Sequence, residues 1–132
     1  MRILHLCDSL NPAGLGGYES ILHYLSAELV TAGHESLVVT QSPARDSPET
    51  VVRPHYKLFH LPGNLLEARK WEFYALPEDE RHEAVERLFT PEDLDEAVSV
   101  LVEQLGRLLR SVQPDVIHAH STYVVFNRVW EV

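Results

Sequence analysis

Two histidines near the carboxyl end of the chain have the spacing best suited to chemistry. His118 and His120 stand two positions apart in the β-compatible segment 115–121, so both imidazoles point to the same side of the expected strand. Imidazoles placed together serve as metal ligands or as catalytic groups near neutral pH. We predict that His120, at the mouth of the strand, is catalytic, and that His118 is a packed, hydrogen-bonded residue of the core.

A metal site is the less favoured interpretation of this histidine pair. A zinc site needs a third and a fourth ligand, and the candidates Cys7 and Asp8 do not stand at a recognised spacing from the histidines. We therefore expect that no residue of this chain binds a metal.

A glycine-rich segment near the amino end is the second candidate site. Residues 14–17 read Gly-Leu-Gly-Gly and lead into a segment with helical periodicity. The free N–H groups and the positive dipole end at a helix N-terminus favour a phosphate, and Gly16 and Gly17 would let it approach closely. A glycine pair is also common in plain turns, but its position in the first strand-to-helix loop favours the phosphate interpretation.

Two standard nucleotide-binding motifs are excluded by the residues around these glycines. A Walker loop carries Lys followed by Ser or Thr after its last glycine, whereas this chain has Tyr18-Glu19. A dinucleotide motif that began with Gly14 and Gly16 would need its third glycine at the position of Glu19, and its first turn is tighter than the loop found here. The glycine segment therefore belongs to neither class.

The chain opens with a strand, a helix and a second strand. An apolar run predicts a strand over 2–7, helical spacing predicts a helix over 17–32 that Gly33 closes, and a second strand is expected at 35–40. Short connections in this order are typical of a right-handed βαβ unit with parallel strands. A third strand is expected at 56–61, after a polar connection that is punctuated by prolines and extends from residue 41 to 54.

The clearest helix begins at Thr90 and stops before Pro114. The Thr90 hydroxyl can cap the helix, Pro91 takes the first helical position, and Asp93 completes a pair resembling a capping box. The apolar residues of this helix form one stripe that should pack on the sheet: Leu94, Ala97, Val98, Leu101, Leu105, Leu108, Leu109 and Val112. With the strand expected at 115–121, the chain is predicted to be α/β, with a Rossmann-like doubly wound parallel sheet.

The expected strand order brings the two candidate sites together. In an open parallel sheet, the ligand crevice lies beyond the carboxyl ends of the strands. If the second and third strands add outward on one side of the first, and the strand with His118 lies on its other side, loop 8–17 and the turn 120–122 flank one cleft. We therefore expect the glycines and the histidines to face each other.

Composition and charge restrict the class of protein. The 132 residues, 45% of them hydrophobic, suffice for one core and one domain. The net charge of -9 opposes a nucleic-acid partner, which requires a basic face. The single cysteine, Cys7, predicts a small buried side chain and a reducing cytoplasmic location, and no apolar run has the length of a signal peptide core or a membrane span.

The segment 65–74 combines basic and aromatic side chains. We expect a helical excursion whose rings pack on the domain, because the acidic stretch 77–86 follows it. The alternative is peripheral contact with an anionic membrane surface on the inner face. The residues themselves assign no role in catalysis to the region 64–90.

Four segments together resemble the retaining glycosyltransferases of the GT-B fold, family 4 type. They are the opening strand 2–6, the loop and helix start 16–19 with Leu25, the passage 32–40, and the segment 114–121. Their order and spacing match the family, whereas the middle of the chain, 44–90, does not. Such enzymes have two facing Rossmann-like domains, of which the first shapes the acceptor site and the second holds the nucleotide.

The resemblance implies transfer of a sugar from a nucleotide-diphosphate donor to an acceptor hydroxyl, with retained anomeric configuration and no metal or other cofactor. Gly16 and Gly17 would contact the donor diphosphate, and His120 would contact the transferred sugar. Three further residues are predicted to bind acceptor or sugar at the cleft wall: Asn11, Ser121 and Thr122.

The resemblance also implies that residues 1–132 are the acceptor-side N-terminal domain, incomplete after Val132, with the nucleotide-binding C-terminal domain absent. We expect the isolated chain to be inactive and its exposed edge strand to promote self-association.

Two alternatives remain open. A non-catalytic phosphate- or nucleotide-binding module would use the same glycine crevice, and a stop codon directly after Val132 would favour it. Half of a sugar-nucleotide epimerase would be distinguished by the product formed from a nucleotide-sugar.

Overall fold

A five-stranded sheet forms the centre of the chain. The computed structural model describes residues 1–7, 17–42, 49–62, 69 and 72–120, and the strand order is β3-β4-β2-β1-β5. The strands are β1 (Arg2–Leu6), β2 (Glu35–Ser42), β3 (Glu49–Val52), β4 (Lys57–Pro62) and β5 (Val116–Ala119). Parallel pairing joins β4 to β2, β2 to β1 and β1 to β5. The predicted α/β class is confirmed, as is the predicted position of the later strands on the two sides of β1.

The polar stretch 41–54, for which the sequence predicts no strand, contains the end of β2 and the whole of β3. β2 continues to Ser42, and β3 pairs antiparallel with β4 at the edge of the sheet. β3 is mostly exposed, and Val51 is the residue that packs against buried side chains. An edge strand of four residues needs little apolar sequence, because one neighbouring strand satisfies half of its backbone groups.

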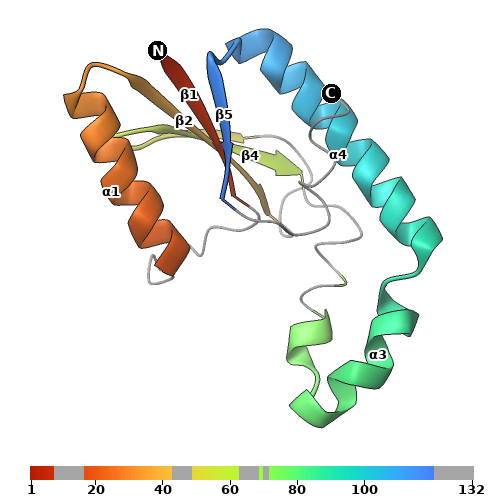
Figure 1. Cartoon of the computed structure of the whole chain (residues 1–132). Helices are drawn as coiled ribbons and strands as arrows, with labels where there is room; N and C mark the ends of the chain where they lie inside the picture. Colours follow the sequence, from red (N-terminus) through yellow and green to blue (C-terminus); the bar gives the residue numbers. More distant parts are fainter. Residues whose placement is uncertain (8–16, 43–48, 63–68, 70–71, 121–132) are drawn as a thin grey trace.

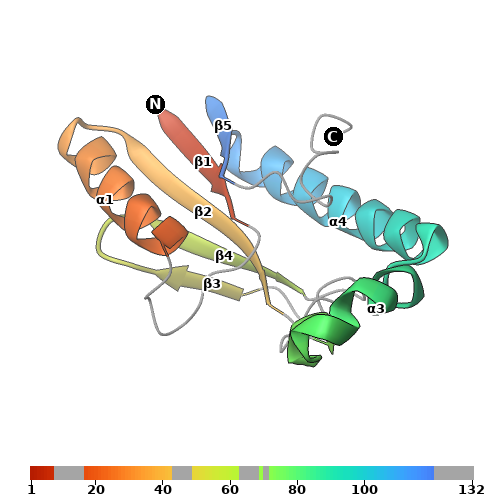
Figure 2. The ribbon, with the colours of Figure 1, turned by 60° about the horizontal axis from the view of Figure 1, so that its bottom comes forward.

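Helices cover the two faces of the sheet. α1 (Gly17–Thr31) lies on one face and α4 (Pro91–Val112) on the other (Figures 1 and 2). Between β1 and β2, α1 runs back from the carboxyl ends of the strands toward their amino ends (Figure 1). The helix predicted over 17–32 is confirmed, and Gly33 follows it with a φ of 81°, a left-handed conformation that glycine adopts without strain.

The strand residues alternate between these two helices. Leu4 and Leu6 of β1 belong to the larger core cluster, in which β2 and β4 residues meet Leu101 and Leu105 of α4. Cys7 belongs to a second cluster with Leu22 of α1. Even-numbered residues of β1 therefore face α4, and odd-numbered residues, His5 among them, face α1.

The ends of α4 are formed as the sequence predicts. The Thr90 hydroxyl accepts a hydrogen bond from the Asp93 amide at 3.2 Å, and Pro91 occupies the first turn. The predicted apolar stripe contains four of the five buried residues of α4, and the fifth, Gly106, was not predicted. The helix ends at Val112, and its C-terminal capping residue, Gln113, has a φ of 46° and precedes Pro114.

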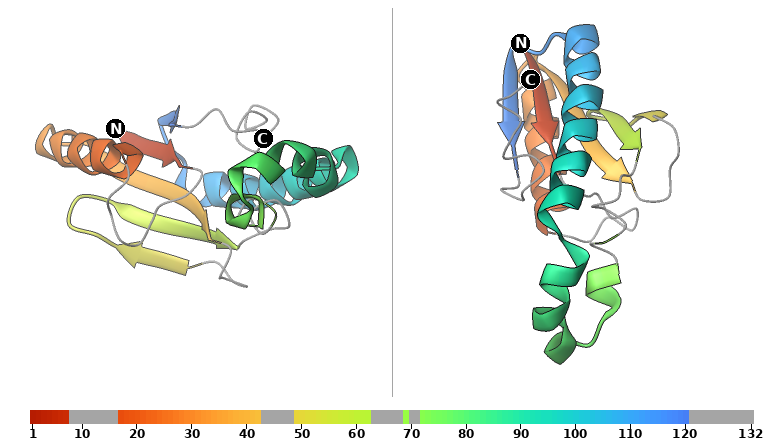
Figure 3. Two further views of the ribbon diagram at one scale, coloured as in Figure 1. Left: turned by 90° about the horizontal axis from the view of Figure 1, so that it is seen from below. Right: turned by 90° about the vertical axis from the view of Figure 1, so that its right-hand side faces the viewer.

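A helical excursion precedes α4. The short helix η1 (Glu78–Glu80) and α3 (Arg81–Leu88) extend beyond the sheet at the end where α4 begins (Figure 3). Arg81 lies over the rings of Phe73 and Tyr74 and donates hydrogen bonds to the carbonyls of Tyr74 and Leu76. The helical excursion is predicted for 65–74, and its described residues, Arg69 and Glu72 to Tyr74, are helical. Residues 65–68, 70 and 71 lie outside the described ranges, and membrane contact stays a prediction. None of the helices in the described ranges is both long and apolar enough to span a bilayer.

Candidate functional site

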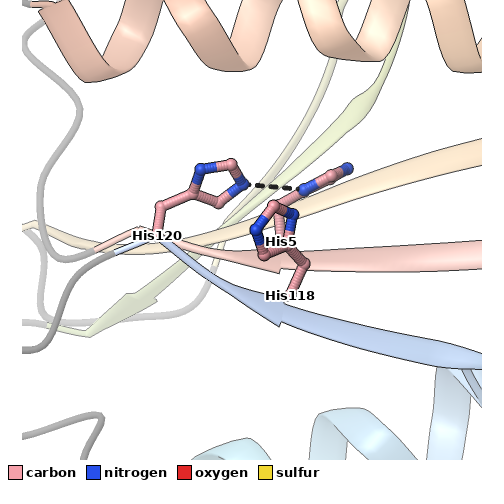
Figure 4. A group of neighbouring side chains, drawn as sticks. All are labelled: His5, His118 and His120. Atoms are coloured by element: carbon pink, nitrogen blue, oxygen red, sulfur yellow. Dashed lines mark hydrogen bonds between the residues drawn. The ribbon is translucent and has the colours of Figure 1, made fainter.

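The structure places a third imidazole beside the two that the sequence singled out. β1 and β5 are parallel, and their register pairs His5 with His118. The ladder continues past β5, where the His120 amide donates to the Leu6 carbonyl at 3.0 Å. Figure 4 shows the three side chains on the face of the sheet that carries α1.

The three rings form a compact group. His5 Nδ1 and His120 Nε2 are 2.9 Å apart and share a hydrogen bond. The ring centroids of His118 and His120 are 4.2 Å apart, and those of His5 and His118 are 5.6 Å apart. Two neighbouring strands thus hold three titratable groups in one cluster, which we call the histidine triad.

Burial keeps the inner rings of the triad uncharged. His5 is fully buried, and this burial, followed by the charges of His120 and His118, lowers the pKa of His5 to about 4. His120 is half-buried, and its pKa is also lowered, first by burial and then by His118. Both imidazoles are therefore neutral at physiological pH, since desolvation disfavours the charged form.

The hydrogen bond within the triad determines which nitrogen of His120 stays available. A neutral imidazole has one N–H donor and one acceptor, so either ring can donate in the His5–His120 contact. His5 Nε2 is buried without a hydrogen-bond partner in the part of the chain that the structure describes. If His5 Nδ1 donates, Nε2 carries no hydrogen and the fold avoids burying an unpaired N–H group. We therefore assign the donor to His5, which leaves an N–H group on His120 Nδ1.

His118 does not occupy the core position that the sequence predicts for it. The whole of β5 is exposed, and His118 lies on the open face of this edge strand. The prediction of a packed core residue is therefore wrong, because β5 lies at the edge of the sheet and its residues are exposed. The buried histidine of the cluster is instead His5, because β1 is the second strand from the edge and has neighbours on both sides.

His5 is the residue that sequence reasoning missed. It lies inside the apolar run at the amino end, 113 positions before His118, and no local spacing connects the two. The available signal was a histidine flanked by apolar residues, between Leu4 and Leu6, at an inner position of a strand. The argument against a metal presumed that no third ligand was near, and this premise is wrong because His5 supplies one.

The remaining predicted site residues are only partly within the described structure. Gly17 is the first residue of α1, on the face of the sheet that also carries the triad. The carboxyl ends of β1 and β5 and the amino end of α1 lie toward the same end of the sheet (Figure 1). Four predicted residues lie outside the described ranges: Asn11, Gly16, Ser121 and Thr122.

Comparison with known families decides the classification of this α/β chain. The sequence profile of Glycosyltransferase Family 4 matches residues 15–130, which is most of the chain. The chain belongs to glycosyltransferase family 4. The match begins inside the glycine segment, includes the triad residues His118 and His120, and extends to positions beyond β5.

Solved structures support the fold of this family 4 chain. One is described as trehalose-6-phosphate from E. coli bound with UDP-2-fluoro glucose, with a TM-score of 0.53 and 17% identity, covering 96% of this chain and 28% of that one. Another, described as the OtsA apo structure, has a TM-score of 0.52 and 18% identity, covering 96% and 29%. No curated protein matches the chain.

These comparisons identify the sheet as that of a GT-B N-terminal domain. At 17% and 18% identity the two structures show the fold alone, and the chain spans less than a third of their length. The family match supports glycosyl transfer in general as the activity of a protein that contains this domain. The predicted resemblance to a GT-B glycosyltransferase N-terminal domain and the predicted fold class are confirmed.

Proposed function

We propose that this domain forms the acceptor side of a glycosyltransferase that moves a sugar from a nucleotide-diphosphate donor to an acceptor hydroxyl with retention. The observation that carries the proposal is the neutral, oriented imidazole of His120. It stands beyond the end of β5, on the face that carries α1, and its Nε2 is engaged by buried His5. Its Nδ1 is left to contact the transferred sugar.

The lowered pKa of His120 suits this role. Glycosyl transfer passes through a sugar with oxocarbenium-like positive charge, and a protonated imidazole beside it would raise the energy of the transition state. Burial and the neighbouring His118 keep His120 neutral. A neutral N–H group can hold a sugar hydroxyl in place without adding positive charge near the reacting carbon.

The helix that faces the triad supports the proposed position of the donor phosphates. α1 begins at Gly17, and the free N–H groups and positive dipole end of its first turn favour an anion. In the proposed site, Gly16 and Gly17 contact the diphosphate, which gains negative charge as the sugar leaves. Asn11, Ser121 and Thr122 complete the proposed wall for sugar and acceptor.

The rest of the proposed site belongs to a second, nucleotide-binding domain. The residues that the structure describes offer the triad and the N-terminus of α1, which suit the sugar and a phosphate but not the base of the donor. The solved neighbour described with UDP-2-fluoro glucose bound supports a nucleotide-sugar as donor class. We therefore expect residues 1–132 alone to show no transfer, and the proposed transfer itself requires no metal or other cofactor.

Product analysis of the two-domain protein tests this proposal. The protein is incubated with candidate nucleotide-sugars and acceptor alcohols, and the anomeric configuration of the product is determined by NMR. Transfer with retained configuration is the expected result. Inverted configuration, or conversion of the nucleotide-sugar into its epimer without transfer, would contradict the proposal. Turnover by residues 1–132 alone would contradict the need for a second domain.

A further inference from the structure

The histidine triad has the composition of a transition-metal site. The ligand nitrogens of His5, His118 and His120 all lie within 4.8 Å of one another. Three imidazoles with one open position form a known arrangement of zinc ligands in enzymes. Because the side chains come from two paired strands, the sheet holds the ligands near one another before a metal binds.

Small side-chain movements would bring these nitrogens to coordination distance. Zn–N bonds of about 2.0–2.1 Å place the nitrogens of a tetrahedral site roughly 3.3 Å apart. His5 Nδ1 and His120 Nε2 are 2.9 Å apart and would separate slightly. His118 is exposed on the edge strand, so its ring can rotate toward them and the metal can enter from that side.

Metal binding requires the hydrogen between His5 and His120 to leave the nitrogen that coordinates the metal. If His5 Nδ1 donates in the free domain, that hydrogen moves to His5 Nε2, so the lone pair of Nδ1 becomes available to the metal. The ring stays neutral and no net proton is released. Coordination thus replaces one hydrogen bond by bonds from three nitrogens.

We infer that His5, His118 and His120 bind Zn²⁺ or a similar late first-row divalent cation, and that the bound metal inhibits sugar transfer. An all-imidazole set suits Zn²⁺, Co²⁺, Ni²⁺ and Cu²⁺, whereas Mg²⁺ and Ca²⁺ require oxygen ligands. The binding claim rests on the geometry of the triad alone. The inhibition claim rests on the proposed function of His120.

Inhibition follows from charge and orientation. A divalent cation on His120 Nε2 would stand beside the sugar as that sugar gains positive charge, which opposes transfer. Coordination would also remove the hydrogen bond with His5 that orients the His120 ring. The bound metal is therefore an inhibitor of sugar transfer and takes no part in the reaction.

The surroundings of His5 limit the affinity. Strong sites usually pair the outer nitrogen of each histidine ligand with an acceptor, and loss of such a partner weakens metal binding about 10- to 100-fold. His5 Nε2 has no hydrogen-bond partner in the described part of the chain. We expect a dissociation constant for Zn²⁺ on the order of 1 μM rather than a nanomolar value.

Titration of metal-free residues 1–132 tests the site directly. Zn²⁺ binding is measured by calorimetry and Co²⁺ binding by visible absorption, for the wild type and for His118→Ala. His118 is exposed, so its replacement should leave the fold intact. We expect saturable 1:1 binding with a tetrahedral Co²⁺ spectrum, at least about 10-fold weaker binding in His118→Ala, and no binding of Mg²⁺ at the same concentration.

Two histidines elsewhere supply matched controls. His34 lies near the amino end of β1, where its Nδ1 is 3.4 Å from the Met1 amino group. His23 is exposed on α1 beside the His55 ring. His34→Ala and His23→Ala should bind Zn²⁺ as the wild type does. Absence of saturable binding, or equal binding by the wild type and His118→Ala, would overturn the site.

The inhibition is tested separately on the two-domain enzyme. Zn²⁺ at saturating concentration should lower the transfer rate, and a chelator should restore it. Full activity with the site shown to be occupied would overturn the inhibitory role and leave the binding site standing. If the enzyme transfers no sugar under any condition, the proposed function fails while the titration result still holds.

Discussion

At the scale of single residues, the triad shows how one buried histidine determines the state of another. His5 faces α1 and is fully buried, so it stays neutral and hydrogen-bonds to His120 instead of to water. The arrangement fixes the ring of His120 while leaving one of its nitrogens toward the carboxyl end of the sheet. Substitutions of His5 should therefore act on His120 as well as on stability.

Acid should destabilise the domain through His5. The pKa of His5 is about 4 in the folded protein and 6.5 without the fold, so below pH 6.5 the unfolded chain binds a proton that the folded chain does not. The contribution of His5 to stability is complete above pH 6.5 and falls by about 3 kcal/mol as the pH drops to 4. Denaturant unfolding at several pH values measures this decline.

The matched comparison for that decline is His5→Leu. The leucine variant removes the titrating group at similar volume, so its stability should fall less steeply than that of the wild type between pH 6.5 and 4. His23→Ala, which changes an exposed histidine on α1, should keep the wild-type slope. Equal slopes for the wild type and His5→Leu would show that His5 is not the group responsible.

The protonation pattern of His120 is a second prediction at this scale. Long-range ¹⁵N NMR at neutral pH should show His120 with hydrogen on Nδ1 and none on Nε2, because His5 donates to Nε2. In His5→Leu the donor is gone, and His120 should populate both tautomers. A wild-type His120 protonated mainly on Nε2 would contradict the assigned direction of the hydrogen bond.

At the scale of elements, α4 and the sheet form the larger part of the core. Leu101 and Leu105 are almost fully buried against Leu4, Leu6 and residues of β2 and β4. α4 also holds the beginning of β1 in place, because the Arg2 guanidinium donates to the Val112 carbonyl. A side-chain ion pair of 2.7 Å joins Arg2 to Glu35 of β2, where it lowers the pKa of the glutamate. The three histidines of the triad lie on the opposite face of the sheet, which carries α1. The core on the α4 side therefore positions the strands without taking part in the chemistry.

Leu105→Ala should destabilise the domain by about 2–5 kcal/mol, because it opens a cavity where α4 meets the sheet. Val100 lies on the same helix but is exposed, so Val100→Ala should change stability by less than about 0.5 kcal/mol. The measurement is urea unfolding monitored by circular dichroism. Similar losses for both variants would mean that α4 does not pack on the sheet through the face described here.

The elements that the sequence predicts best are those in which apolar residues repeat at regular spacing over many positions. The stripe of α4 and the cap at Thr90 follow from local spacing and chemistry, as does the left-handed Gly33 after α1. β3 escapes prediction because, in the described sheet, its four residues pair with β4 alone, and local spacing does not show this pairing. The triad escapes for a related reason: His120 could be proposed from its strand alone, but His5 joins it only through the register of β1 with β5.

At the scale of the whole molecule, β5 is the edge of the sheet that is expected to contact other molecules. It is an edge strand, and Val116 and Ile117 are exposed. An edge of this kind presents unpaired N–H and C=O groups to any partner strand. Figure 2 shows β5 and β3 on opposite sides of the sheet, as the strand order requires.

The isolated chain should self-associate through this edge. Light scattering at increasing concentration should show a mass above that of the monomer, and Ile117→Lys should reduce it, because a charged side chain at an edge opposes strand pairing. Val52→Lys places the same charge on exposed β3 and serves as the control. A strict monomer, or equal reduction by both variants, would contradict association through β5.

The central claim is that His120, held by His5, contacts the transferred sugar, and transfer kinetics of the two-domain enzyme test it most directly. His120→Ala should lower kcat by about 100-fold or more, with an intact fold by circular dichroism, because it removes a group that positions the reacting sugar. His23→Ala should retain the wild-type rate. A His120→Ala enzyme that transfers sugar as fast as the wild type would contradict the account.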